Sequence, residues 1–133
     1  SAHYVVGEDG TVYRLVAEDR VAWHAGKSWW RGREGLNATS IGIEIVNLWG
    51  DTNDYPPPQV AALVELCRGI LARHPAIAPR NVVGHSDIAP KRKIDPGTRF
   101  PWRALAEAGI RTTRKDGLRV TPPGRLANER ALG

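Results

Sequence analysis

The sequence predicts an α/β domain in which helices pack around one β-sheet, and three segments carry this prediction. Residues 3–7 and 11–16 are short apolar runs on either side of EDG at 8–10, a triplet typical of a hairpin turn because glycine readily adopts a positive φ. Residues 40–47 alternate isoleucine with glycine, glutamate or valine, which is the period of a strand. Residues 58–73 repeat apolar side chains at helical spacing.

The predicted helix runs from Pro58 to Arg73, because proline suits a first helical turn and Pro75 disfavours the α region for the residue before it. His74 is expected to cap the C-terminal end, where an imidazolium would meet the helix dipole. Cys67 lies in the apolar stripe and is expected in the core, and a single cysteine forms no internal disulfide.

Two short elements are expected later in the chain. Residues 81–84 predict a strand that ends at His85, and Pro101 to Ala108 predict a closing helix that begins on a proline. Near the start, apolar residues appear at once at 4–6, so we expect the chain to open inside a strand and a segment to be missing upstream.

Length and charge predict one domain followed by a basic extension. The chain has 133 residues with 41% hydrophobic content, enough for one core. It has no apolar run long enough for a transmembrane helix. Of the formal charge of +5, residues 111–133 carry +4. We therefore expect a domain at 1–110 and an extension at 111–133, which is either a solvated linker or attracted to an anionic surface. No nucleic-acid motif accompanies this charge, so a nucleic-acid partner is not expected.

The densest polar segment is residues 84–97, GHSDIAPKRKIDPG, whose prolines and glycines indicate a structured loop. In it, His85 and Asp95 offer an imidazole and a carboxylate, the ligand types of a catalytic zinc. Glu44, within an isoleucine-rich strand, would suit a general base, and Lys93 could stabilise an oxyanion. Spacing alone leaves the alternatives open: a surface loop with a capping histidine, a solvent-facing strand for Glu44, and a solvated charge for Lys93.

The loop at 84–97 resembles the signature of the zinc-dependent N-acetylmuramoyl-L-alanine amidases, which are related to peptidoglycan recognition proteins. Further matches in the same order are SAHY at 1–4, AWHAG at 22–26, Asn37 with SIGIE at 40–44, and FPW at 100–102. The resemblance covers residues 1 to about 110. It implies a mixed central β-sheet flanked by helices, with a first strand that precedes this chain.

The resemblance also implies the roles of individual residues. His85 and Asp95 would bind Zn²⁺, Glu44 would be the catalytic carboxylate, and Lys93 would stabilise the transition state. The reaction would be hydrolysis of the amide between the lactyl group of N-acetylmuramic acid and L-alanine, in peptidoglycan or muropeptides. A non-hydrolytic peptidoglycan-binding module is the alternative.

Trp23, His24 and Asn37 are expected in the substrate groove, with packing beneath the loop as the alternative for Trp23 and His24. The third zinc ligand of the family is a histidine on a strand before the SAHY motif. It is therefore expected upstream of Ser1, on a longer precursor or a separate N-terminal fragment, because His3 matches a motif histidine that is not the ligand.

The FPW motif and the tryptophan-rich SWWRG at 28–32 resemble envelope-located members of the family. We therefore expect a periplasmic enzyme of a Gram-negative bacterium. The alternative is the cytosolic recycling enzyme specific for anhydro-muropeptides.

Overall fold

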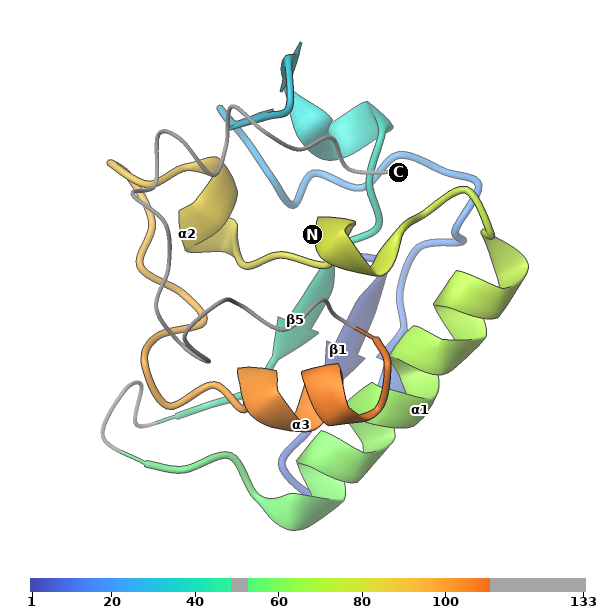
Figure 1. The fold of residues 1–133 in the computed structure, drawn as a ribbon, viewed down its shortest axis with the longest axis vertical. Helices are drawn as coiled ribbons and strands as arrows, with labels where there is room; N and C mark the ends of the chain where they lie inside the picture. The colour runs from blue at the N-terminus through green and yellow to red at the C-terminus, as the bar shows by residue number, and fades with distance from the viewer. Residues whose placement is uncertain (49–52, 111–133) are drawn as a thin grey trace.

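A computed structural model describes residues 1–48 and 53–110 of the chain (Figure 1). Its central sheet has three short strands, β1 (Tyr4–Val6), β2 (Val12–Arg14) and β5 (Ile43–Ile45), in the order β2-β1-β5. β1 pairs antiparallel with β2 and parallel with β5, so the sheet is mixed, as the resemblance implies. The hairpin predicted around residues 8–10 is confirmed.

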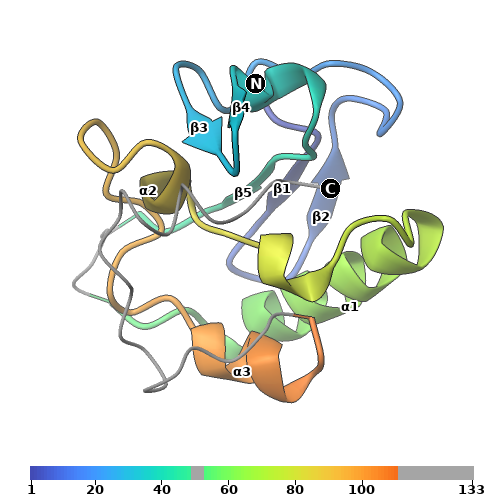
Figure 2. The same cartoon turned by 45° about the horizontal axis from the view of Figure 1, so that its top comes forward.

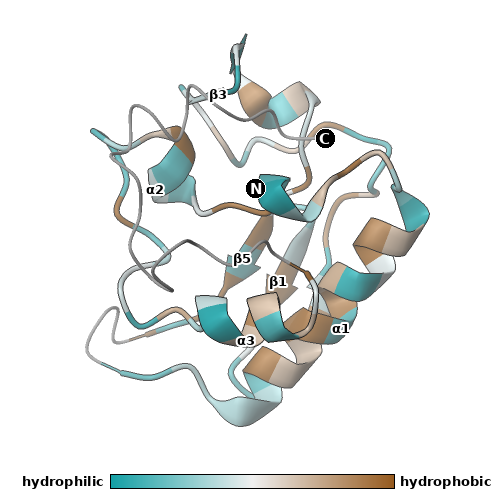
Figure 3. Cartoon of the chain, viewed as in Figure 1, coloured by the Kyte–Doolittle hydropathy of each residue, from teal (hydrophilic) through white to brown (hydrophobic). Residues whose placement is uncertain are grey.

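The long helix α1 (Pro57–Arg73) covers one face of this sheet, within one residue of the predicted start and at the predicted end (Figure 1). Leu63 and Cys67 of α1 form a core cluster with Phe100, Leu105 and Ile110, and Ile43 and Ile45 of β5 pack against it. Cys67 is thus a core residue, as predicted. In Figure 3 the strands β1 and β5 are largely apolar and α1 alternates between apolar and polar bands. The predicted closing helix is α3 (Trp102–Glu107).

A second group of elements lies at the other end of the sheet from α3 (Figure 2). It contains the hairpin β3 (Trp29–Trp30) and β4 (Arg33–Glu34), the 3-10 turn η1 (Leu36–Ala38) and the short helix α2 (His85–Ile88). Their buried side chains form a separate cluster of Ala25, Trp30, Leu36 and Ile88. These four elements were not predicted, because each is too short to show a period in the sequence.

The prediction of a strand at residues 81–84 is wrong. The 3-10 turn η3 (Pro79–Asn81) ends there, residues 82–84 pair with no strand among residues 1–48 and 53–110, and His85 begins α2. The segment is apolar for another reason, because Val82 packs on the α1 cluster while Val83 packs on the Trp30 cluster. Residues 82–84 therefore connect the two cores.

The predicted basic extension at 111–133 lies outside the described residues. Within the described part of the chain, no helix combines the length and the apolarity that a membrane crossing requires.

Glu18 ties the sheet to the C-terminal end of α1. Its carboxylate accepts hydrogen bonds from the Tyr4 hydroxyl, from Arg73 Nη2 at 2.6 Å and from His74 Nε2 at 2.8 Å. The hydrogen bonds from Arg73 are the main reason that the pKa of Glu18 falls to about 2. His74 is the C-cap residue, as predicted, but its ring contacts Glu18.

We predict that Glu18→Gln lowers the free energy of unfolding by about 1.5–3 kcal/mol at pH 7, because the ion pairs lose their charge. The pKa of Glu18 is lower in the folded state, so this contribution is complete above the ordinary pKa of 4.5 and disappears as the pH falls towards about 2. Urea unfolding of both proteins between pH 2 and 7 measures the difference. Glu65→Gln is the control, since Glu65 forms only an exposed pair with Arg68. A difference that does not change with pH would contradict the prediction.

Candidate active site

His85 is the first residue of α2, and the backbone on both sides of it is fixed. The Asp87 carboxylate accepts a hydrogen bond from the Gly84 N–H at 2.8 Å, which caps the helix start. The Ser86 N–H donates to the Asp95 carbonyl oxygen at 2.9 Å. The two residues that the sequence singles out as metal ligands are thereby brought together from the two ends of one loop.

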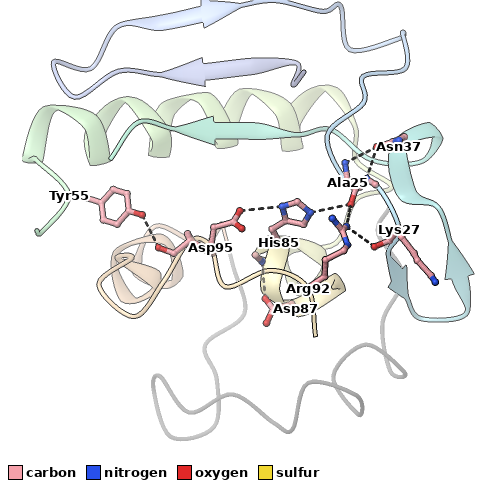
Figure 4. Close-up of polar contacts among 11 residues, drawn as sticks. Ala25, Lys27, Asn37, Tyr55, His85, Asp87, Arg92 and Asp95 are labelled. Carbon is pink, nitrogen blue, oxygen red and sulfur yellow. Dashed lines mark hydrogen bonds and ion pairs between the residues drawn. The ribbon is translucent and has the colours of Figure 1, made fainter. Parts of the chain in front are cut away.

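The side chains of His85 and Asp95 face each other, with 3.2 Å between Nδ1 and Oδ2 (Figure 4). His85 Nε2 lies 3.1 Å from the carbonyl oxygen of Ala25, which can only accept, so Nε2 carries the proton. With a proton on Nδ1 as well, the contact with Asp95 is a hydrogen bond to the carboxylate, whereas in the neutral ring Nδ1 presents a lone pair to it. Two acceptors at this distance fit a shared cation, and a carbonyl on the other ring nitrogen is typical of metal-bound histidine.

His85 and Asp95 therefore fit as two of the ligands of a zinc ion. Among residues 1–48 and 53–110, no group of three histidine, cysteine, aspartate or glutamate side chains could hold a metal. The third ligand, which the resemblance places before Ser1, stays a prediction.

The loop that supplies the Ala25 carbonyl is held by Asn37, whose Oδ1 lies on its other side (Figure 4). This oxygen accepts hydrogen bonds from the N–H groups of His24 at 3.0 Å and Ala25 at 2.7 Å, and a longer one from Gly26 at 3.4 Å. Asn37, predicted to contact substrate, thus braces the loop at residues 24–26. Its contact with substrate stays a prediction.

The Asp95 end of the loop is anchored by Tyr55, whose hydroxyl donates to the Pro96 carbonyl oxygen at 2.8 Å. Pro96 in turn approaches Gly84 so closely that a Cβ on Gly84 would lie 2.7 Å from Pro96 Cδ. Glycine at 84 is therefore required for the two ends of the loop to meet. Lys93, two residues before Asp95, is half-buried, and its N–H donates to the Ala89 carbonyl oxygen at 2.9 Å.

Glu44 lies on the face of the sheet opposite α1. Ile43 and Ile45 point towards α1, and successive side chains in a strand alternate between faces, so Glu44 points the other way and is exposed. His24 lies over the same face, because a Cβ on Gly42 would come within 2.4 Å of its Cγ and Cδ2 atoms. Glu44 therefore shares a face of the sheet with His24, and its role as a catalytic carboxylate stays a prediction.

His24 is half-buried, and its two ring nitrogens have different partners. Nδ1 donates to the Ala22 carbonyl oxygen at 3.0 Å, and Nε2 lies 2.8 Å from Ser40 Oγ. The Ser40 hydroxyl itself donates to the Leu36 carbonyl oxygen at 2.6 Å. Burial is the main reason that the pKa of His24 is lowered. Beside it, Trp23 exposes 76% of its surface and is free to contact a ligand.

His3 serves the fold. It is fully buried, its Nδ1 accepts from the Gly42 N–H at 3.0 Å, and its Nε2 donates to the Arg20 carbonyl oxygen at 2.8 Å. Both nitrogens are in use, so neither is available to a metal.

The sequence matches the N-acetylmuramoyl-L-alanine amidase family model over residues 1–98. The chain belongs to this amidase family. The AmiD amidase of Escherichia coli K12 is 45% identical over an alignment of 124 positions, which covers 83% of this chain and 45% of AmiD. The 1,6-anhydro-N-acetylmuramyl-L-alanine amidase AmpD of Enterobacter cloacae is 47% identical over 102 residues, which are 77% of this chain and 53% of AmpD.

The solved structures agree with the sequence relatives. The complex of E. coli AmiD with the substrate anhydro-N-acetylmuramic acid-L-Ala-D-γ-Glu-L-Lys has a TM-score of 0.80 at 43% identity, and the match covers 85% of this chain and 49% of that one. The predicted amidase fold is thereby confirmed. The chain spans about half the length of the relatives it matches.

Arg92, for which the sequence predicted no role, contacts the loop at residues 24–27. Arg92 donates from Nη2 to the carbonyl oxygens of Ala25 at 2.8 Å and Lys27 at 2.7 Å. Its position in the basic run at 91–93 is typical of solvated charges, so no local signal separates it from its neighbours. Its place in the matched family motif was the one available indication.

We predict that Gly42→Ala destabilises the domain by about 1–3 kcal/mol, because the new Cβ overlaps the His24 ring and must displace it. Urea unfolding measures the loss, and the NMR shifts of the His24 ring report its movement. Gly69→Ala is the matched control, since a Cβ there meets only the flexible end of Arg73 and alanine favours a helix. Equal stability of Gly42→Ala and the parent protein would show that the close approach is not real.

Proposed function

We propose that this domain is a zinc-dependent amidase that hydrolyses the bond between N-acetylmuramic acid and L-alanine in peptidoglycan or muropeptides. The observation that carries the proposal is the 3.2 Å distance between His85 Nδ1 and Asp95 Oδ2. The N–H at His85 Nε2 donates a hydrogen bond to the Ala25 carbonyl oxygen. The substrate follows from E. coli AmiD, whose structure contains a muropeptide in which this amide joins the sugar acid to L-Ala.

His85 and Asp95 would hold the zinc through Nδ1 and Oδ2, with the predicted upstream histidine as third ligand. When bound, zinc lowers the pKa of a water molecule and polarises the substrate carbonyl. The Ala25 carbonyl keeps the proton on Nε2, so that Nδ1 remains a donor of its lone pair.

Glu44 and Lys93 supply the acid–base chemistry and the charge stabilisation. Glu44 takes a proton from the attacking water and returns it to the L-alanine nitrogen as the carbon–nitrogen bond breaks. The water oxygen ends in the lactyl carboxylate, and the freed amine keeps the returned proton. The ammonium of Lys93 offsets the negative charge on the carbonyl oxygen during attack.

Trp23, His24 and Asn37 form the substrate-binding part of the proposal. The exposed Trp23 ring offers an apolar surface, and the loop that contains His24 is held by Asn37 next to it, so substrate contact by all three is part of the proposal. We also propose that the enzyme acts in the cell envelope, which the FPW and SWWRG segments favour. Activity in periplasmic and cytoplasmic fractions of the source cells tests this location.

We predict that, in a protein that carries the predicted upstream histidine, His85→Ala and Asp95→Ala each abolish stoichiometric zinc binding, because each removes one ligand atom. Metal content after dialysis measures the effect. His74→Gln is the control histidine variant, since His74 contacts Glu18. Full zinc content in either ligand variant would refute the assignment.

We predict that Glu44→Ala lowers the turnover of a muropeptide by about 10²- to 10⁴-fold and leaves the zinc content unchanged, because only the general base is lost. Chromatography of the released peptide measures turnover, with exposed Glu65→Gln as the control. Unchanged turnover in Glu44→Ala would exclude this role. A parent protein that binds the muropeptide and does not cleave it would favour the non-hydrolytic alternative.

A further inference from the structure

We propose that Arg92 is a positioning residue for metal binding, which acts through the Ala25 carbonyl on the ring of His85. The inference rests on the proposed function, because it takes His85 as a zinc ligand. Arg92 itself would touch neither the metal nor the substrate.

Arg92 and His85 share one hydrogen-bond acceptor. The Ala25 carbonyl oxygen accepts from Arg92 Nη2 at 2.8 Å and from His85 Nε2 at 3.1 Å. A carbonyl oxygen has two lone pairs, so one oxygen can serve both donors. The shorter, charge-assisted bond from Arg92 fixes the direction of this carbonyl, and the direction of the carbonyl sets the orientation of the His85 ring.

The loop at residues 24–27 is held from both sides (Figure 4). Arg92 Nη2 also donates to the Lys27 carbonyl oxygen at 2.7 Å, so the guanidinium joins two carbonyls across Gly26. On the other side, Asn37 Oδ1 accepts from the N–H groups of residues 24–26. The backbone of Ala25 is thus held at its N–H by Asn37 and at its carbonyl oxygen by Arg92.

The loop also leaves space for the guanidinium of Arg92 at Gly26. Gly26 has a φ of +62°, and a Cβ there would lie 3.0 Å from Arg92 Nη2. Glycine therefore permits both the backbone conformation and the close approach of Arg92. A solvated surface arginine would require neither.

The test compares metal affinity in Arg92→Ala, Arg92→Lys and Lys91→Ala, each made in a protein that carries the predicted upstream histidine. Partners of metal-bound histidines typically contribute about 10- to 100-fold in metal affinity, so we expect Arg92→Ala to weaken zinc binding by that factor in a chelator competition. Arg92→Lys keeps the charge on a shorter, non-planar head and should show a smaller loss. Lys91 is exposed, and Lys91→Ala should bind zinc like the parent protein.

The visible spectrum of the Co²⁺-substituted protein is the second readout, because it reports ligand geometry. We expect it to change in Arg92→Ala while the melting temperature of the metal-free protein stays near that of the parent. Unchanged zinc affinity and an unchanged spectrum would overturn the inference. If Arg92→Ala does not fold, Arg92→Lys decides: parental affinity and spectrum in that variant overturn the inference, and a loss of affinity supports it.

His85→Ala separates this inference from the proposed function. Parental zinc affinity in His85→Ala would overturn the proposed function together with the role of Arg92. Loss of zinc in His85→Ala with no effect in Arg92→Ala would overturn the role of Arg92 alone.

Discussion

The hydrogen bond from His85 Nε2 to the Ala25 carbonyl oxygen is the interaction on which the arrangement of the site depends. It joins two loops that are 60 residues apart in sequence and assigns the ring proton to Nε2. Without it, the ring could rotate and Nδ1 would lose its fixed approach to Asp95. The remaining loop contacts, from Asn37, Arg92 and Tyr55, hold the groups at the two ends of this arrangement in place.

The two faces of the central sheet have different roles. α1 covers the face of Ile43 and Ile45, and Gln59 of α1 donates to the carbonyls of Val6 and Val46, which holds the helix to the ends of β1 and β5. The opposite face carries Glu44 and accommodates the ring of His24 over Gly42. A single alternation along β5 therefore separates the residues that stabilise the core from the residue proposed for proton transfer.

Sequence patterns predicted the elements whose period is long enough to recognise. The seventeen-residue helix α1 repeats its apolar stripe over several turns, and the hairpin combines a turn triplet with two apolar runs. Residues 82–84 misled the prediction, because they are extended and apolar for packing between two clusters. An apolar run alone does not distinguish such a connection from a strand.

The pairing of His85 with Asp95 was predictable because both lie in one short loop and match a family motif in order. The bracing by Arg92 and Asn37 was not, because each contacts the backbone of a distant loop. Backbone groups are present at every residue and leave no pattern in the sequence. Such contacts become visible only when the chain is folded.

The placement of Cys67 inside the α1 cluster has a practical consequence for studying this domain in solution. The chain has one cysteine, and burial raises the pKa of its thiol to about 12. The reactive species in alkylation is the thiolate, which is scarce at neutral pH in such a group. A cysteine introduced on the surface, for instance beside Trp23, can therefore be labelled selectively with a maleimide dye while the native thiol stays in place.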